Sequence, residues 1–277
     1  MHNNLFLRLI SAVILTPIVL AVIVCGGIYS EFSYVYDIFL AIVGCLMATE
    51  WNRMITGKED WVSACLTLMS CGIIGFVYIN PFVSIIFIPL AALFLYLKTR
   101  NILLSFGAFY IGIPMLALMY IAYFTDSGDG DLSYSYMYIL WLLFVVWSTD
   151  IGAYVVGKTV GGPKLCPTVS AKKTWSGFFG GLLFSAITAY VFVTSVHYFD
   201  ESQLSMGALV LSSVGLSFIA QMGDLFESKI KRHLGIKDSG NLIPGHGGIF
   251  DRVDSLLFAA PVVALFVFLM NMGCFHK

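Results

Sequence analysis

The chain has 277 residues, of which 59% are hydrophobic and 11% are charged. Soluble domains carry about 25% charged residues, so the composition excludes an ordinary soluble domain and indicates an integral membrane protein. The formal net charge of −1 points to no partner of opposite charge, and we expect no nucleic-acid binding. The six cysteines form no CxxC pair and mostly lie in apolar segments, so they are expected to be small buried hydrophobic residues rather than a disulfide or zinc framework.

The first apolar segment resembles a secretory signal peptide at first sight. Its apolar run is about 20 residues long, whereas the apolar core of a signal peptide has roughly 7–15, and no A-x-A cleavage site follows it. We therefore predict that this segment is the first membrane-spanning helix.

Further apolar segments follow at regular intervals. A helix that crosses the hydrocarbon core needs about 20 mainly apolar residues. By that rule nine segments are predicted to span the membrane, at 9–29, 32–51, 61–79, 81–97, 102–124, 136–157, 175–196, 206–226 and 251–273. The third and fourth meet at Asn80 and Pro81, which predicts a tight turn between them. The expected fold class is an all-α polytopic membrane protein.

The lysines and arginines predict the orientation of these helices. With the N-terminus in the cytoplasm, 14 of the 15 cationic residues fall in inside segments, and only Lys277 falls outside. The outside connections 124–133 and 197–205 contain no lysine or arginine. Because cytoplasmic loops carry an excess of these residues, we expect nine spans with the N-terminus inside and the C-terminus outside.

The first long inside connection, Thr149 to Thr174, combines an acidic residue, several glycines and two adjacent lysines. Asp150 lies within an apolar segment, where a carboxylate is costly and by default marks a functional site; the alternative is an interhelical hydrogen bond. Lys172 and Lys173 are expected to open the next helix, where cations beside a helix N-terminus suit a phosphate. Anchoring at the inner membrane surface is the alternative for these lysines.

The second long connection, Gln221 to Ser255, collects carboxylates at two helix ends. Asp224 and Glu227 share a helix face with Lys231, and Asp251 and Asp254 are likewise three residues apart. Carboxylate oxygens are ligands for Mg²⁺, which usually takes one or two carboxylates plus substrate phosphates.

Between these helix ends lies a glycine-rich turn at 244–248, whose bare N–H groups would hold phosphates. Carboxylates, basic residues and a phosphate cradle at a membrane edge favour phosphoryl or nucleotidyl transfer onto a lipid. Transporters remain an alternative, since they also place aspartates and broken helices near the bilayer.

This connection also carries a family resemblance. It is similar to the signature of the phosphatidate cytidylyltransferases, also called CDP-diacylglycerol synthases. Every fixed position of that pattern is filled, by Ser228, Ile230, Lys231, Arg232, Lys237, Asp238, Gly240, Ile243, Pro244, His246, Gly247, Gly248, Ile249, Asp251, Arg252, Val253 and Asp254. The upstream connection resembles the family in Asp150-x-Gly152-Ala153-Tyr154 and Lys172-Lys173-Thr174, so the resemblance spans the whole chain.

Two positions depart from the family pattern. Ala171 stands where the family often has proline, and Ser176 stands where it often has glutamate. The second change removes a carboxylate near the expected phosphate site, and no role is assigned to position 176.

The resemblance implies transfer of CMP from CTP to phosphatidate, which gives CDP-diacylglycerol and pyrophosphate in phospholipid biosynthesis. It implies Mg²⁺ with a second cation, K⁺, and a homodimer in the cell (inner) membrane whose active site faces the cytoplasm. We expect one integral membrane domain over 1–277, with N-terminal helices in 1–125 and the helices and cytoplasmic loops that carry the catalytic site in 136–277.

The resemblance and the charges together assign candidate roles. Asp224 and Asp251 are the expected metal ligands, and the expected catalytic residues are these two with Lys172, Lys173 and Asp254. Residues expected to contact the substrates are Asp150, Ser228, Lys231, Arg232, Lys237, Asp238, His246, Gly247, Gly248 and Arg252.

Two other functions compete with this one. A secondary transporter usually shows an internal repeat, and none is visible between the two halves of the sequence. A CTP-dependent kinase acting on a lipid alcohol would release CDP rather than pyrophosphate, and the complete signature favours the cytidylyltransferase.

Overall fold

The structure is a computed structural model that describes residues 2–28, 32–77, 80–124, 132–195, 205–243, 245 and 247–272. Within these residues the chain forms nine helices and one two-stranded hairpin. The chain divides into two compact units, each described by itself. Unit 1 comprises Met1–Tyr136 and His233–Val253, and unit 2 comprises Met137–Arg232 and Asp254–Lys277.

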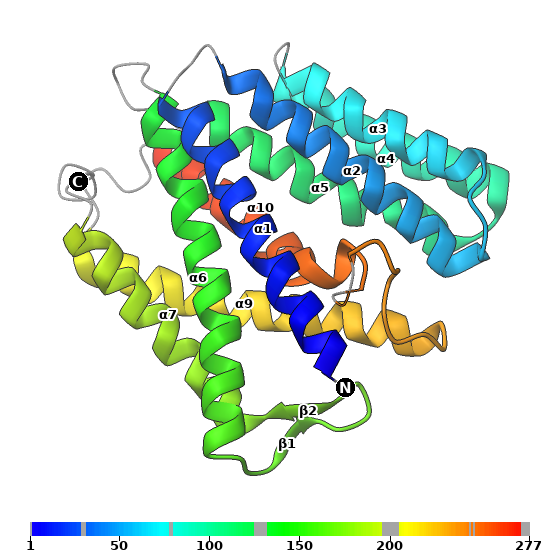
Figure 1. The fold of residues 1–277 in the computed structure, drawn as a ribbon. Coiled ribbons are helices and arrows are strands. Elements are labelled where there is room, and N and C mark those ends of the chain that lie inside the picture. Colours follow the sequence, from blue (N-terminus) through cyan, green and yellow to red (C-terminus); the bar gives the residue numbers. More distant parts are fainter. Residues whose placement is uncertain are drawn as a thin grey trace. The chain divides into compact units, whose positions relative to one another are not determined.

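Five helices build most of unit 1. They are α1 (His2–Ile28), α2 (Ser33–Thr56), α3 (Trp61–Val77), α4 (Pro81–Thr99) and α5 (Ile102–Phe124). Helices α2 to α5 pack side by side, and α1 packs on α2 (Figure 1). The predicted break at Asn80 and Pro81 is confirmed, because the Asn80 side chain accepts a hydrogen bond from the backbone N–H of Phe82 (2.9 Å) and caps α4, with Pro81 as the first helical residue.

An aromatic cluster lies at the centre of unit 1. Trp51 of α2 is fully buried, and its ring centroid lies 5.3 Å from that of Tyr110 on α5 and 5.6 Å from that of Phe250. The rings of Tyr110 and Phe250 stack with an interplanar angle of 5°. Aromatic pairs at such separations add to the stabilisation that burial provides, so the cluster holds the first residue of the last helix against α2 and α5.

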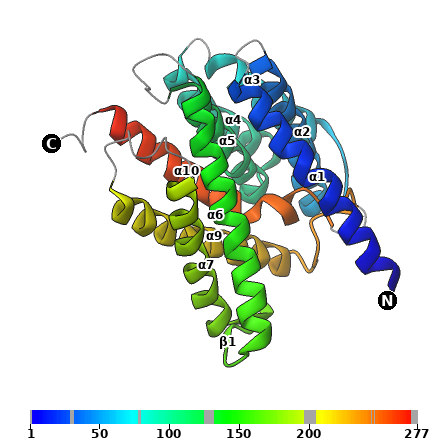
Figure 2. The ribbon, with the colours of Figure 1, turned by 60° about the vertical axis from the view of Figure 1, so that its left-hand side comes forward.

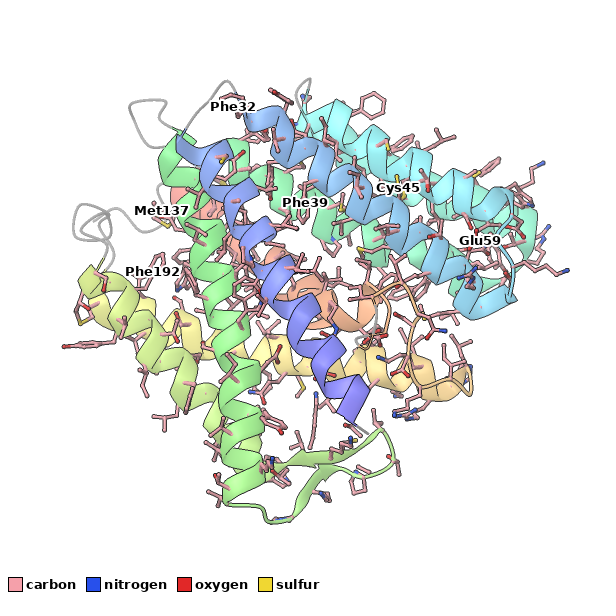
Figure 3. All side chains as sticks on the ribbon, in the orientation of Figure 1. Phe32, Phe39, Cys45, Glu59, Met137 and Phe192 are labelled. Carbon is pink, nitrogen blue, oxygen red and sulfur yellow. The ribbon has the colours of Figure 1, made fainter. Side chains whose placement is uncertain are left out.

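The outer surface of unit 1 is apolar. On α4, Phe82, Ile86 and Leu90 are 60%, 61% and 57% exposed and follow one another at four-residue intervals, so they form one stripe on the helix. Charged side chains gather instead around the end of α2, where Arg53 in its last turn pairs with Glu59 at 2.8 Å (Figure 3). An apolar stripe of this kind suits contact with lipid tails.

Seven helices among the described residues are long and apolar enough to cross a membrane. The apolar parts of α1 and α3 are shorter, at Val13–Gly26 and Trp61–Val77. The expected class, an all-α polytopic membrane protein, is therefore confirmed.

Unit 2 contains the remaining elements, which are most of α6 (Leu132–Thr159), β1 (Lys164–Cys166), β2 (Ser170–Thr174), α7 (Trp175–Ser195), most of α9 (Met206–His233) and most of α10 (Phe250–Asn271). A hairpin and the end of one helix differ from the sequence prediction. The connection predicted between the sixth and seventh spans contains the antiparallel β1–β2 hairpin, visible beside α7 in Figures 1 and 2. The helix predicted to end at 226 continues to His233.

Helices α6 and α7 approach each other closely at glycines. A Cβ on Gly152 would lie 2.5 Å from Cγ of Phe184 and 2.8 Å from the carbonyl oxygen of Gly180. A Cβ on Gly177 would lie 2.7 Å from the carbonyl oxygen of Ala153. Small residues are typical where membrane helices pack backbone to backbone, so Gly152 of α6 and Gly177 of α7 serve helix packing.

Buried polar side chains link α6 and α7 to α9. Trp141 Nε1 of α6 donates to Ser213 Oγ of α9 (2.9 Å), and Thr149 Oγ1 is hydrogen-bonded to Ser217 Oγ (2.8 Å). One turn further along α9, Gln221 Nε2 donates to the carbonyl oxygen of Phe178 on α7 (3.3 Å). These bonds satisfy polar groups inside unit 2 and fix α9 against its neighbours.

Candidate functional site

Four carboxylates of unit 2 come together from three helices. Asp254 of α10 interacts electrostatically with Asp224 and Glu227 of α9 and with Asp150 of α6. The approach of α9 to α10 depends on Gly223, where a Cβ would lie 2.8 Å from the carbonyl oxygen of Asp254. Like charges at short range repel one another, so positive charge nearby stabilises the cluster.

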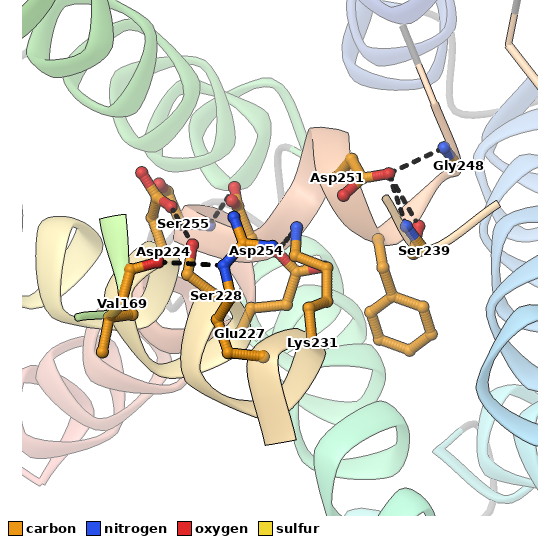
Figure 4. Close-up of polar contacts among 12 residues, drawn as sticks. Val169, Asp224, Glu227, Ser228, Lys231, Ser239, Gly248, Asp251, Asp254 and Ser255 are labelled. Atoms are coloured by element: carbon orange, nitrogen blue, oxygen red, sulfur yellow. Dashed lines mark hydrogen bonds and ion pairs between the residues drawn. The ribbon is translucent and has the colours of Figure 1, made fainter. Parts of the chain in front are cut away.

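Two lysines supply positive charge to this acidic cluster. Lys173 Nζ lies 2.5 Å from Asp224 Oδ2, and the two side chains are 25% and 27% exposed. Lys231 Nζ lies 2.9 Å from Glu227 Oε2, and those side chains are 10% and 1% exposed (Figure 4). The first pair is therefore partly exposed, although Lys173 Nζ itself is buried, whereas both side chains of the second pair are buried within the unit.

The β1–β2 hairpin positions the lysines differently from the prediction. Lys172 and Lys173 were expected to open a helix, but both lie in β2 and α7 begins only at Trp175. Successive strand residues point to opposite faces, so Lys173 reaches Asp224 while Lys172 is exposed. The end of α9 is tied to the same hairpin, because Arg232 Nε donates to the carbonyl oxygen of Val169 (3.3 Å).

Residues 237–249, which we call the signature loop, fold around Asp251 in unit 1. Asp251 Oδ2 accepts hydrogen bonds from the N–H (2.8 Å) and the hydroxyl (3.0 Å) of Ser239 and from the N–H of Gly248 (2.9 Å) (Figure 4). Gly247 has φ +89°, and a Cβ there would lie 2.5 Å from the same oxygen. Glycine is required at 247 both for the backbone conformation and for the space that the carboxylate occupies.

The other predicted site residues lie in both units. Ser228 Oγ of α9 donates to Asp224 Oδ1 (3.3 Å). Lys237, Asp238 and Arg252 are exposed in unit 1, and His246 lies outside the described residues.

The predicted metal pair is divided between the units, with Asp224 in unit 2 and Asp251 in unit 1, so their joint role stays a prediction. Asp224 was expected to end its helix; this is wrong, because α9 continues through the signature residues to His233. In the part of the chain that the structure describes, no group of three or more His, Cys, Asp or Glu residues is assembled to hold a metal ion.

Sequence reasoning missed Glu50 of α2, which is only 6% exposed. Its Oε1 accepts a hydrogen bond from the N–H of Ile249 (2.8 Å), and its Oε2 accepts from the N–H of Phe250 (3.1 Å) and the hydroxyl of Ser239 (3.1 Å). One signal was available: Glu50 lies inside the predicted span 32–51, and a carboxylate within a span marks a functional position.

Comparison with known proteins connects these features to a family. Residues 6–270 match the model of the Cytidylyltransferase family. The chain belongs to this family. Among relatives of this cytidylyltransferase, the phosphatidate cytidylyltransferase of Brucella melitensis is 35% identical over 95% of this chain and 93% of its own length. That of Bacillus subtilis is 43% identical over 54% of this chain and 56% of its own length.

The resemblance inferred from the signature is thereby confirmed. The carboxylates and lysines of unit 2 and the signature loop of unit 1 all fall within the matched residues of this cytidylyltransferase. Glu50 falls within them as well.

Proposed function

We propose that this protein is an enzyme that transfers CMP from CTP to phosphatidate and produces CDP-diacylglycerol and pyrophosphate. The observation that carries the proposal is the family match over nearly the whole chain, together with relatives named phosphatidate cytidylyltransferase. The substrates would be CTP from solution and phosphatidate from the bilayer, which suits a multi-pass membrane protein.

The chemistry needs charge rather than a strong base. A phosphate oxygen of phosphatidate forms a bond to the α-phosphorus of CTP, and the bond from that phosphorus to the oxygen bridging the β-phosphate breaks, so pyrophosphate leaves. The nucleophile is already an anion at neutral pH, and the main obstacle is repulsion between two polyanions. The partly exposed Lys173 beside Asp224 supports a role in binding phosphate, as does the exposed Lys172.

Mg²⁺ is the cofactor that we propose, with Asp224 and Asp251 as its ligands and K⁺ as a second cation. The donor chemistry fits, because Mg²⁺ takes carboxylate oxygens and the crowded carboxylates of unit 2 would be stabilised by a cation. Mg²⁺ commonly binds one or two carboxylates and completes its shell with water and substrate phosphates. When bound, it would supply positive charge to both phosphate groups.

The orientation and assembly are further parts of the proposal. We propose nine membrane crossings with the N-terminus in the cytoplasm, a site facing the cytoplasm of the cell (inner) membrane, and a homodimer. The distribution of lysine and arginine supports this orientation.

Cysteine labelling in intact cells tests the orientation. In a background without native cysteines, Asn241→Cys, an exposed position, should react with a membrane-impermeant maleimide only after lysis. Gly130→Cys, at a position outside the described residues, should react before lysis. Labelling of both in intact cells would contradict the nine-span topology.

One assay tests the activity. Purified protein in detergent is given phosphatidate, Mg²⁺ and CTP labelled at the α-phosphate, and the lipid product is separated and counted. We expect labelled CDP-diacylglycerol, release of pyrophosphate, and loss of turnover when EDTA removes the divalent cation. Transfer of the γ-phosphate to lipid with release of CDP would instead identify a lipid kinase.

A further inference from the structure

Glu50 joins α2 to a part of unit 1 that is remote from it in sequence. Its carboxylate accepts hydrogen bonds from Ser239 and Ile249 in the signature loop and from Phe250, the first residue of α10. Both of its oxygens are engaged, and the side chain is buried. Hydrogen bonds to a charged acceptor are stronger than those between neutral groups, so this carboxylate fixes the loop to the helix bundle.

The Glu50 carboxylate lies at the N-terminus of another helix, α10, and this position strengthens the attachment. The first N–H groups of a helix have no partner within the helix, and the positive end of the helix dipole favours an anion there. Glu50 supplies that anion to the first residue of α10, and Asp251 follows immediately in the same turn. The orientation of the Asp251 backbone is therefore set in part by a residue on another helix.

Ser239 connects Glu50 directly with Asp251. Its buried hydroxyl lies 3.1 Å from Glu50 Oε2 and 3.0 Å from Asp251 Oδ2. A hydroxyl has one proton to donate, so it serves one carboxylate at a time, while the Ser239 N–H remains bonded to Asp251 (2.8 Å). The two carboxylates thus share one partner.

The signature glycine at 248 is explained by the same contacts. A Cβ there would lie 2.5 Å from Glu50 Oε2 and would also collide with the Ser239 hydroxyl. The N–H of Gly248 meanwhile donates to Asp251 Oδ2 (2.9 Å). The signature loop therefore has the shape that two carboxylates, one from α2 and one from α10, require.

We propose that Glu50 is a positioning residue for the transferase reaction. It acts through Ser239 and the start of α10 to hold Asp251 in its working orientation. This inference rests on the proposed function, in which Asp251 is a metal ligand. In this proposal Glu50 acts on Asp251 through these contacts and not on a substrate.

The test compares Glu50→Gln with Glu59→Gln. Glutamine keeps the shape of Glu50 but removes its charge and one acceptor, whereas Glu59 is exposed and pairs only with Arg53 among the contacts described. In Glu50→Gln we expect kcat to fall by roughly 10- to 100-fold, the usual scale for partners that orient a metal ligand. The KM for CTP should change less than kcat, and Glu59→Gln should match wild type.

A second readout does not depend on activity. Hydrogen–deuterium exchange in Glu50→Gln should be faster at the amides of Ser239, Gly248, Ile249 and Phe250, with unchanged exchange in peptides from α4. Unchanged exchange at these four amides would overturn the proposed anchoring. A wild-type kcat despite a lowered melting temperature would show that Glu50 serves stability alone and would overturn the positioning role.

Ser239→Ala keeps the inference testable if Glu50→Gln does not fold. It deletes the shared hydroxyl and leaves the two backbone donors to Glu50, so we expect a smaller fall in kcat.

Where Glu50→Gln folds, the losses of kcat in the double variant Glu50→Gln/Ser239→Ala should be non-additive, as expected for groups in one network. Full additivity would contradict the shared role. Absence of CDP-diacylglycerol formation by wild-type protein would instead refute the proposed function itself.

Discussion

Asp251 in unit 1 and Asp224 in unit 2 carry the same functional group in different surroundings. Asp251 Oδ2 accepts three hydrogen bonds from the signature loop, so it both organises a loop and offers a carboxylate. Asp224 contacts Lys173 and Ser228 and lies near other carboxylates. Asp251 accepts from two backbone N–H groups and one hydroxyl, whereas Asp224 lies among charged side chains. A substitution at Asp251 should therefore affect folding as well as activity, and one at Asp224 should affect mainly activity.

The largest expected effect is on turnover. Asp224→Asn and Asp251→Asn preserve size but remove the charge that binds a hard cation, so each should lower kcat by at least about 100-fold. The double variant should lose little more than either single variant, because residues that act as a unit are non-additive. The rate of Mg²⁺-dependent product formation measures the single and double variants, with Glu59→Gln as a control that should match wild type. Substantial activity in either single variant would remove that residue from the metal site.

The lysines of β2 should show the next largest effect. A charge-assisted contact to phosphate contributes about 1.5–3 kcal/mol, so Lys172→Ala and Lys173→Ala should each reduce CTP-dependent activity by roughly ten- to a hundredfold. Lys58→Ala and Lys98→Ala, which change exposed residues at or just beyond helix ends of unit 1, serve as controls. Equal losses in all four variants would identify the lysines of β2 as general surface anchors.

Stability should distinguish the two aspartates. Asp251→Asn removes the charged acceptor of three loop donors, so we expect a loss of about 1–3 kcal/mol and a lower melting temperature in detergent. Asp224→Asn removes a partly exposed ion pair and should leave the melting temperature close to wild type. Equal melting temperatures for Asp251→Asn and Asp224→Asn would contradict the proposed difference between the two aspartates.

A smaller effect is expected where α6 packs on α7. Gly152→Ala places a methyl group against Phe184 and the Gly180 carbonyl, so overpacking should cost about 1–3 kcal/mol. The matched control is Gly215→Ala in α9, where a Cβ would meet nothing within 4 Å and alanine is the better helix former. Melting curves should place Gly152→Ala below wild type and Gly215→Ala at or slightly above it.

Much of this fold follows from apolar segment length. The nine predicted segments correspond to the nine helices of the described residues, because the hydrocarbon core requires long apolar helices. The end of α9 was missed, since the charged residues from Glu227 onward ended the apolar run while the helix continued to His233. A hydropathy pattern locates the membrane-compatible part of a helix and not its last turn.

The sequence predicted many of the residues of the candidate site but not which of them contact one another. The signature identified Asp251, and the charge pattern and the upstream motif identified Asp224 and Lys173, yet spacing along the sequence could not place Lys173 on a strand next to Asp224. Glu50 was missed because its partners lie about 190–200 positions away and nothing local indicates such pairing. Long-range hydrogen bonds depend on tertiary packing, which a single sequence does not specify.

The bonds that link α6 to α9 have a consequence for biosynthesis. Trp141 and Thr149 enter the membrane with α6, but Ser213 and Ser217 are synthesised only with α9. Chains are made from the N-terminus onward, and polar groups at membrane depth are unfavourable until they find partners. Helix α6 is therefore made before the α9 side chains that hydrogen-bond to Trp141 and Thr149. These interhelical bonds form only after α9 has been made.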